Sequence, residues 1–271
     1  VAIDGKTLRG SHDGEKKAEH IVNAWVDENN LILGQLKTAS KSNEITAIPE
    51  LLELLYLKDA IITIDAMGTQ KKIAEKIIEG EGNYVLALKG NHKFFSKDVR
   101  AFFEKHDKLD YEDIKVAYKI TEETGHGRHE IREYTQTSDI ESIEGIDTWK
   151  GLSSVGKVKR TITKNGKTTV ETLYYISSLE TPIEGDCNLF AKAVRNHWGV
   201  ESCHWILDVV FHEDNSRIRL NNGAANVSLL RKIALNIVKQ EKVSTKKMSL
   251  KLKRYLASID INFLESIIDN I

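Results

Sequence analysis

Short apolar runs and amphipathic stretches alternate along the first ninety residues of the chain. Apolar runs bounded by turn-forming residues predict strands at residues 1–8, 21–26, 31–38, 60–65 and 84–88. Between them, apolar residues recur with the helical period and predict helices at residues 44–57 and 69–79. The first part of the chain therefore combines three successive strands with alternating helices and strands.

The pattern changes after residue 91. A helix near residues 95–105 precedes strand-like runs at 114–121, 129–136, 152–162 and 170–178, and helical segments follow near 187–197, 200–211, 223–240, 248–257 and 260–268. This order predicts an α/β fold with a ribonuclease-H-like mixed five-stranded sheet flanked by helices, and a mainly β insertion before the final helices. The corresponding domains are the first part of the core (1–91), the insertion (92–184), the completion of the core (185–240) and a helical extension (241–271).

Composition is that of a folded protein in a reducing compartment. The chain has 271 residues, with 41% hydrophobic and 29% charged residues and only two prolines, so one large domain or a core with an inserted subdomain is expected. No apolar run approaches the ~18 residues of a membrane span, and no signal peptide precedes the first strand. We expect a cytoplasmic protein, and interpret the start at Val1 as a fragment or trimmed chain. Cys187 and Cys203 are expected to be free thiols.

Charge is unevenly distributed along the chain, although the net charge is −1. Residues 150–167 contain six Lys or Arg and no acid, and residues 239–254 contain seven against Glu241 alone. These segments could neutralise DNA phosphates, and the alternative interpretation is a solvated basic face.

Three carboxylates occupy positions that suit metal chemistry. Asp4 lies within the first predicted strand, Asp65 ends the strand at 60–65, and Glu201 lies in a predicted helix. Burying an acid is costly unless it is paired or binds a cation, and phosphodiester cleavage uses carboxylates from different elements to hold two divalent ions about 3.5–4 Å apart. An oxygen donor set without a Cys/His cage favours Mg²⁺, with Mn²⁺ as a substitute.

The helix of Glu201 has a polar side. Glu201, His204, Trp205 and Asp208 share one face, but Asp208 is about 10–11 Å from Glu201 along the helix axis and is not expected to share its ion. His204 could contact phosphate or the metal shell, or be a packed histidine with a satisfied hydrogen bond. We expect Trp198 and Trp205 to pack in the core, with base stacking as the alternative.

Several motifs in one order carry a family resemblance. The chain resembles the ISAs-type insertion-sequence transposases, or H-repeat-associated proteins, of the DDE transposase superfamily from Val1 to about Lys239. The motifs are Asp4-Gly5-Lys6, Asp65-Ala66-Met67-Gly68-Thr69-Gln70, Leu86-Ala87-Leu88-Lys89-Gly90-Asn91-His92, Gly125-His126-Gly127-Arg128 and His197-Trp198-Gly199-Val200-Glu201-Ser202, followed by His204-Trp205, Leu207-Asp208-Val209, Glu213-Asp214 and Asn236.

The resemblance implies a DDE transposase catalytic domain, with Asp4, Asp65 and Glu201 as the catalytic and metal-binding acids. Such enzymes cut transposon ends with metal-bound water and then use a 3′-hydroxyl to attack target DNA. The implied partners are double-stranded DNA and further copies of the chain on that DNA, and the implied cofactor is two divalent ions, with no small-molecule cofactor. A neighbouring group carries Tyr, Arg and Lys around the glutamate, where this chain has Val194, His197 and Asp208.

Candidate DNA contacts lie near the proposed acids and in the basic segments. Arg195 and His204 are candidates to replace the missing signature residues, and Arg128 and Arg132 share one side of a predicted strand, where Arg can bind phosphate bidentately. The full set is Lys89, Asn91, His92, Arg128, Arg132, Arg195, His204, Lys246 and Lys247.

Three hypotheses remain open at this level. The first is a DDE transposase domain that cleaves DNA and transfers strands. The second is a ribonuclease-H-like nuclease that uses the same acids without strand transfer, and the third is a non-catalytic, truncated transposase remnant that only binds DNA. The three acids are all present, whereas the helical region that usually precedes the first aspartate in the family is absent.

Overall fold

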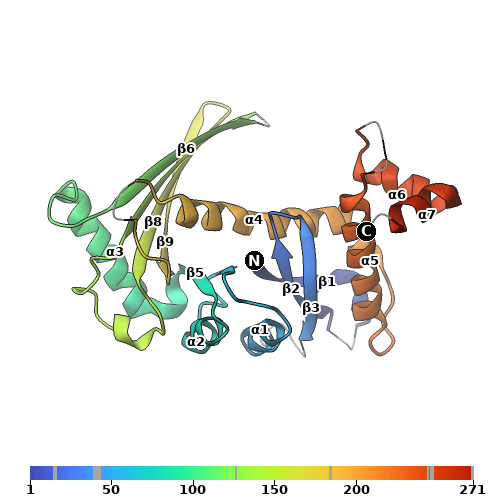
Figure 1. Cartoon of the computed structure of the whole chain (residues 1–271), viewed down its shortest axis with the longest axis horizontal. Helices are drawn as coiled ribbons and strands as arrows, with labels where there is room; N and C mark the ends of the chain where they lie inside the picture. Colours follow the sequence, from blue (N-terminus) through green and yellow to red (C-terminus); the bar gives the residue numbers. More distant parts are fainter. Residues whose placement is uncertain are drawn as a thin grey trace. The chain divides into compact units, whose positions relative to one another are not determined.

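The computed structural model describes residues 1–14, 17–38, 44–125, 127–182, 185–242, 244 and 247–269. The chain forms two compact units (Figure 1). The terminal unit consists of Ala2–Leu55 and Trp198–Ile271, and the central unit consists of Val1 and Tyr56–His197. Each unit is described by itself.

The terminal unit is an antiparallel sheet covered by helices. Its strands are β1 (Ala2–Leu8), β2 (Glu19–Val26) and β3 (Leu31–Thr38), in the order β3-β2-β1. Its helical elements are η1 (Arg9–Ser11), α1 (Glu44–Glu53), the second half of α4 (Asn188–Val209), η5 (Glu213–Asn215), α5 (Gly223–Gln240), α6 (Leu250–Ile259) and α7 (Ile261–Ile268). The helices α1 and α5 both pack on β2 and β3.

The two faces of this small sheet carry different side chains. Because side chains alternate along a strand and Asp4 pairs with Asn23, these two residues share one face with Trp25. That face packs against α4 and α5, where Trp25 joins an apolar cluster with Val200 of α4 and Leu235 of α5. The opposite face meets α1.

The central unit is a larger mixed sheet. Its strands are β4 (Ile61–Ile64), β5 (Asn83–Leu88), β6 (Ala117–Gly125), β7 (Arg128–Thr137), β8 (Ser154–Lys164) and β9 (Lys167–Ser177), in the order β4-β5-β9-β8-β7-β6. Only the β4–β5 pair is parallel among these described pairs. The helical elements are α2 (Lys71–Glu79), η3 (Gly90–His92), α3 (Lys93–Lys108), η4 (Ile146–Thr148) and the first half of α4, with α2 packed on β5 and α3 on β9.

The prediction of a five-stranded sheet is wrong, because the described residues contain nine strands, three in the terminal unit and six in the central unit. The predicted β insertion is not a separate layer. Its last strand, β9, pairs antiparallel with β5, and β8, β7 and β6 continue the hydrogen bonding from there. The predicted α/β class and mixed sheet are confirmed.

The prediction of two helices at 187–197 and 200–211 is also wrong, because α4 runs without interruption through Gly199. A Cβ at Gly199 would lie 2.7 Å from Nε1 of Trp25. The absence of a side chain therefore lets this part of α4 approach β2, and that packing outweighs the weak helix propensity of glycine.

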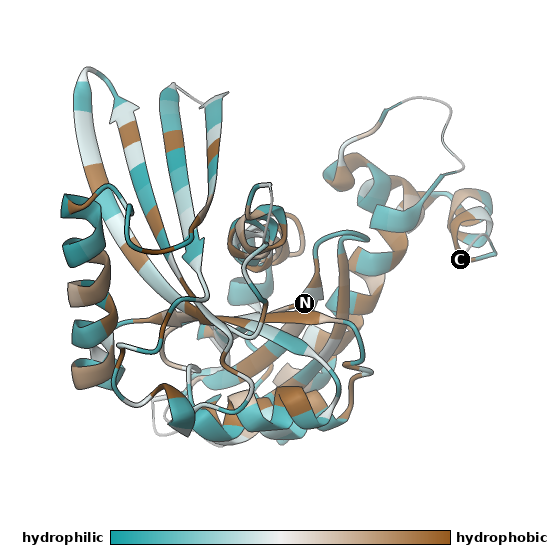
Figure 2. Cartoon of the chain, turned by 60° about the vertical axis from the view of Figure 1, so that its left-hand side comes forward, coloured by the Kyte–Doolittle hydropathy of each residue, from teal (hydrophilic) through white to brown (hydrophobic). Residues whose placement is uncertain are grey.

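Most other predicted elements are confirmed, with ends that differ by a few residues. The long strands of the central unit extend beyond the core, as the hydrophilic colouring of their outer parts shows (Figure 2): the first six residues of β9 are exposed and its last three are buried. In β9 the outer half therefore lacks a buried face, which accounts for its imperfect alternation in the sequence. The predicted domain boundaries stay a prediction. None of the described helices combines the length and apolar character needed to cross a bilayer.

Candidate catalytic site

Asp4 projects from the face of β1 that meets α4. Its Oδ2 lies 3.5 Å from Nδ1 of His204 on α4, and Nε2 of the same ring lies 3.2 Å from Nδ2 of Asn23 on β2. Burial, with the charges of Lys6 and Lys232, lowers the pKa of His204 to about 3, so the ring is neutral near pH 7. Because Nδ2 of Asn23 donates to Nε2, the ring proton is on Nδ1 and faces Asp4.

Glu201 lies on the same helix, one turn before His204. Residues three apart are neighbours on a helix surface, so Glu201 shares the side of α4 on which His204 meets Asp4. Glu201 is exposed and Asp4 is partly exposed. Both carboxylates are therefore accessible to solvent and to a bound substrate.

A buried lysine lies two residues beyond Asp4 on the same face of β1. Nζ of Lys6 contacts Asp208 at 2.7 Å, Asp214 at 3.3 Å and Glu213 at 3.5 Å, and the Lys6 side chain is only 7% exposed. Glu213 is also buried and accepts a hydrogen bond from Ser228 of α5 at 2.7 Å. Asp208 thus pairs with Lys6, and the network ties β1 to the end of α4 and to η5.

Asp65 follows β4 in the central unit and is held by its own turn. Its Oδ1 accepts hydrogen bonds from the backbone N–H groups of Met67 and Gly68, each at 3.1 Å. The hydroxyl of Thr69 donates to the carbonyl oxygens of Asp65 at 3.1 Å and of Ala87 on β5 at 2.7 Å. The carboxylate is therefore fixed at the carboxyl end of a buried strand.

The residues after β5 support this turn. Nδ2 of Asn91 donates to the carbonyl of Ala66, and Nε2 of His92 lies 2.6 Å from the carbonyl oxygen of Thr69. Lys89, just before them, is exposed. The predicted DNA contacts of Asn91 and His92 stay a prediction, but both side chains also have a structural role in holding the Asp65 turn.

His197 lies in the first half of α4, also in the central unit. Its Nδ1 is 2.9 Å from the hydroxyl of Thr63 on β4. Burial lowers the pKa of His197, and the negative charge of Asp65 opposes this shift. His197 therefore bonds to β4 two residues before Asp65.

The donor chemistry of these acids suits a hard divalent cation, since carboxylate oxygens are the ligands that Mg²⁺ prefers. Within the part of the chain that the structure describes, no three His, Cys, Asp or Glu side chains cluster closely enough to hold a metal ion. Asp4 and Glu201 belong to the terminal unit and Asp65 to the central unit. Convergence of the three acids stays a prediction.

The two tryptophans of α4 are not the core residues we expected. Trp205 is 62% exposed and Trp198 is 37% exposed. The helix buries Val200, Cys203 and Leu207 instead. The expectation of core packing is wrong for Trp205, because it lies on the polar side of α4 with Glu201.

The three arginines proposed as DNA contacts all form ion pairs with glutamates, but their side chains differ in exposure. Arg132 is buried, and its Nη2 lies 2.6 Å from Oε1 of Glu130. Arg128 is exposed and lies 3.4 Å from Glu130, and Arg195 forms a two-atom ion pair with Glu123 at 3.2 Å. Arg132 and Glu130 together stabilise the interior of β7.

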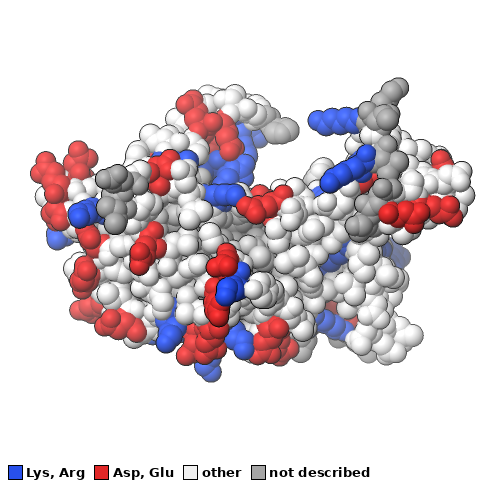
Figure 3. Space-filling view, in the orientation of Figure 1, with Lys and Arg blue, Asp and Glu red and all other residues white. Residues whose placement is uncertain are grey.

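The two basic segments are partly neutralised within the fold. In β8, Lys159 lies 3.0 Å from Glu133 and Arg160 pairs with Glu130, and acidic and basic side chains are interspersed over the visible face of the central unit (Figure 3). In the second segment, Lys253 lies 2.7 Å from Glu241. Lys247 is exposed, and Lys246 lies outside the described residues.

Sequence reasoning assigned no role to the residues that surround Asp4. Asn23, Lys6 and Glu213 are buried polar residues with partners on other elements. Lys6 had a signal in the sequence, because a lysine inside an apolar strand requires an anionic partner. The identity of that partner depends on packing against η5, which no local pattern reveals. Cys187 and Cys203 are free, as expected, and buried.

Known proteins are similar to this chain in sequence and in fold. The model of the Transposase DDE domain family matches residues 1–237. The chain is 43% identical over 277 residues to "H repeat-associated putative transposase YhhI" of Escherichia coli K12, covering 99% of this chain and 71% of that protein. It is 42% identical over 275 residues to "Putative transposase YncI" of Escherichia coli O157:H7, covering 99% of this chain and 68% of that protein.

The fold is also that of a solved transposase. The piggyBac transposase, determined as a synaptic complex with hairpin DNA, superposes with a TM-score of 0.51 at 12% identity, covering 98% of this chain. The chain spans 53% of that protein's length. The likeness at this identity concerns the fold alone, and the family match and the relatives carry the assignment. The chain belongs to the DDE transposase family.

Proposed function

We propose that this chain is a DDE transposase catalytic domain that cleaves double-stranded DNA at the ends of an insertion sequence and transfers the cut strands to a target. Asp4, Asp65 and Glu201 are the proposed catalytic acids. They would hold two divalent ions, with Mg²⁺ as the metal and Mn²⁺ as its substitute. A DNA substrate implies action at the bacterial nucleoid, with self-association of the chain on DNA.

The contact between Asp4 and His204 is the single observation that carries the proposal. It lies within the terminal unit and brings the helix of Glu201 to the first aspartate, 3.5 Å away at His204. Glu201 precedes His204 by three residues, about 4.5 Å along the axis at the usual helical rise. An aspartate on a strand and a glutamate on the helix packed against it are the arrangement that the chemistry requires.

The second half of the argument concerns Asp65. His197 forms a hydrogen bond with Thr63 on β4, and the negative charge of Asp65 opposes the lowering of the His197 pKa by burial. Glu201 follows His197 by four residues, so His197, Glu201 and His204 share one side of α4. Asp65 is the second aspartate of the proposal, and the turn after β4 holds it within its own unit.

Family membership implies divalent metal ions, which when bound would activate water and stabilise the leaving oxygen. The residues of this chain have their own tasks. The His204 ring, held by Asn23, orients the carboxylate of Asp4. The backbone N–H groups that bind Oδ1 of Asp65 fix the direction of that carboxylate. Exposed Glu201 completes the oxygen donor set.

Metal binding and cleavage together test the proposal. An ion at 100 times its dissociation constant stabilises the folded state by about 2.7 kcal/mol, which corresponds to roughly 5–11 °C in melting temperature for a chain of this size. Asp65→Asn should remove most of this shift with Mg²⁺ or Mn²⁺ and abolish cleavage. Asp59→Asn is the matched control, because Asp59 is exposed with φ of 60°, a conformation that asparagine accepts.

Retained cleavage in a clean Asp65→Asn preparation would place the nuclease site elsewhere. A strand-transfer assay with pre-cut ends separates the other outcomes. Cleavage without strand transfer would identify a nuclease of the same fold, and binding without cleavage in both metals would identify a non-catalytic DNA-binding remnant.

A further inference from the structure

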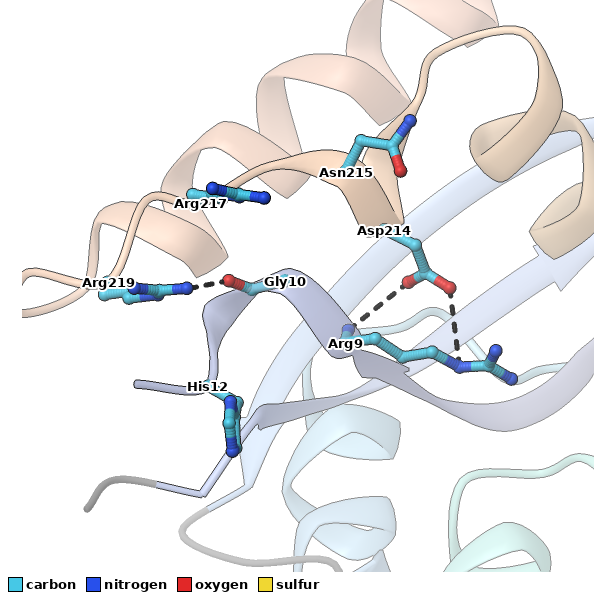
Figure 4. Close-up of a pocket in the computed structure, with 7 residues that line it drawn as sticks. All are labelled: Arg9, Gly10, His12, Asp214, Asn215, Arg217 and Arg219. Carbon is cyan, nitrogen blue, oxygen red and sulfur yellow. Dashed lines mark hydrogen bonds and ion pairs between the residues drawn. The ribbon is translucent and has the colours of Figure 1, made fainter. Parts of the chain in front are cut away.

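A cationic pocket lies at the end of β1, beyond the proposed acids. It is about 360 Å³ in volume and belongs entirely to the terminal unit (Figure 4). One wall comes from η1 and the residue after it, and the other comes from η5 and the segment that follows. It is lined by Arg9, Gly10, His12, Asp214, Asn215, Arg217 and Arg219.

The walls of this pocket are held by tight contacts. A Cβ at Gly10 would lie 2.6 Å from the carbonyl oxygen of Asp214, so only glycine allows the two backbones to approach this closely. Nε of Arg219 donates to the carbonyl of Gly10 at 3.4 Å. Oδ1 of Asp214 accepts from the N–H of Arg9 at 3.3 Å and from buried Lys6 at 3.3 Å. The pocket is therefore built on the same network that fixes β1.

The lining carries excess positive charge. Arg9, Arg217 and Arg219 contribute three positive charges against one negative charge from Asp214, a balance of +2 with His12 counted as neutral. Asp214 is also shared with Lys6, which reduces its capacity to neutralise the arginines. All three arginines are exposed at the pocket, so an anion can bind without first breaking a buried ion pair.

We propose that this pocket binds a backbone phosphate of the DNA substrate. Arginine binds phosphate oxygens with a planar, bidentate donor geometry, and the pocket offers three such groups around a preformed hollow. The proposal rests on the proposed function, because it names a contact that would position DNA for the acids on the same strand.

The distance along β1 gives the position of that phosphate. Arg9 follows Asp4 by five residues, about 16 Å at the usual rise of a strand. The axial rise of one DNA strand is about 3.4 Å per nucleotide. For DNA whose axis follows β1, the pocket should therefore hold a phosphate roughly four to five nucleotides from the bond that is cut.

Salt-dependent binding of a short DNA duplex, measured with the full chain and without metal, tests the pocket apart from cleavage. Each lost phosphate contact lowers the log–log salt slope by about 0.9, so Arg217→Gln/Arg219→Gln, which removes the one phosphate contact of the pocket, should lower it by about 0.9 and weaken binding about 5-fold at 0.15 M salt. Lys97→Gln/Arg100→Gln is the control, because it removes two exposed charges from α3 of the central unit. Its slope should match that of the wild type.

A single-residue variant and a modified DNA separate the loss of phosphate binding from a loss of structure. Arg219 bonds to Gly10, so Arg217→Gln alone should lower the slope by part of this amount without that structural loss. A single methylphosphonate, four or five nucleotides from the cut bond, should weaken wild-type binding. The same methylphosphonate should weaken DNA binding by the double variant much less, because the protein change and the DNA change remove the same contact.

A wild-type slope in folded Arg217→Gln/Arg219→Gln would overturn the proposal. So would competition by inorganic phosphate at the pocket with no change in the DNA slope, which would assign the site to a free anion. The result is independent of catalysis. Slope loss in a chain that never cleaves would retain the pocket and reject the proposed function, and cleavage with unchanged slopes would do the reverse.

Discussion

Replacing Lys6 with methionine should strongly destabilise the terminal unit. Lys6 is the cation shared by Asp208, Glu213 and Asp214, at 2.7, 3.5 and 3.3 Å. Methionine keeps most of the volume of the side chain and removes only the charge. Glu213, which is 1% exposed, would then be a buried anion that has lost the cation in contact with it, although the charge of Lys232 still acts on it.

The magnitude follows from the burial of the partners. Removing one partner of a buried ion pair costs about 3–5 kcal/mol. The side chains of Asp208 and Asp214 are 33% and 24% exposed, so water can solvate them after the change. We therefore expect the lower end of the range, about 3 kcal/mol, or roughly 6–12 °C in melting temperature.

Urea unfolding followed by circular dichroism measures this loss, with the slope compared to exclude a change in the unfolded state. Arg9→Met is the matched control, because Arg9 contacts the same Asp214 at 3.5 Å but is 83% exposed. An exposed pair contributes about 0–1 kcal/mol. Glu213→Gln in the Lys6→Met background should recover part of the stability, because it removes the stranded anion.

The pH dependence gives a second check. Burial would lower the pKa of Lys6, but the hydrogen bond to Asp208 and the nearby carboxylates raise it above its usual 10.5. A raised pKa means that the contribution is complete below 10.5 and is lost only as pH rises further. The gap between wild type and Lys6→Met should thus stay constant from pH 7 to 9. A loss under 1 kcal/mol, or one equal to that of Arg9→Met, would refute the argument.

Three other changes test separate parts of the structure. Burial lowers the pKa of Lys232 to about 8, so the unfolded chain binds more protons than the folded one between pH 8 and 10.5. The free energy of unfolding should therefore rise by about 2–3 kcal/mol over this range. Lys232→Met should flatten that rise in unfolding experiments at different pH. Asn91→Ala removes a hydrogen bond to the Asp65 turn, so it should lower the free energy of unfolding by about 1–2 kcal/mol and reduce cleavage. Lys89→Ala, at an exposed position, should leave the melting temperature unchanged. Equal melting temperatures of the two variants would contradict this role of Asn91. Trp205→Ala should keep the fold, since Trp205 is 62% exposed, and weaken binding of single-stranded DNA ends by about 1–3 kcal/mol if a base stacks there; unchanged affinity in a binding titration would exclude stacking.

Local patterns predicted the elements better than their connections. Strands at the start of the chain were identified because apolar runs end at turn residues, and β1, β2 and β3 lie where expected. The extension of the sheet was missed, because pairing of β9 with β5 joins residues about ninety positions apart. The break predicted at Gly199 was wrong for a similar reason: the glycine serves a distant contact with Trp25.

The candidate site shows the same division. Asp4 was proposed because an acid in a buried strand is costly unless it is paired or binds a cation. Glu201 was proposed because a helical glutamate after two strand aspartates is the order of two-metal enzymes and of the family that the chain resembles. Their neighbours could not be deduced, because the partner of Asp4 depends on strand register and on the rotation of α4. Asn23 lies beside Asp4 only because β1 and β2 pair in this register. A shift of one residue would turn it to the other face.

The alternation of β1 would link the proposed catalysis to stability. Ala2, Asp4, Lys6 and Leu8 share the face toward α4 and α5, so an apolar residue, an acid, a base and another apolar residue follow each other along it. Asp4 must stay accessible for the proposed chemistry, and the strand must nevertheless stay fixed. Lys6 provides that anchor through carboxylates at the end of α4 and in η5. The same carboxylate, Asp214, then forms a wall of the cationic pocket. A change at Lys6 should therefore alter stability and phosphate binding together, whereas a change at Arg217 should alter phosphate binding alone.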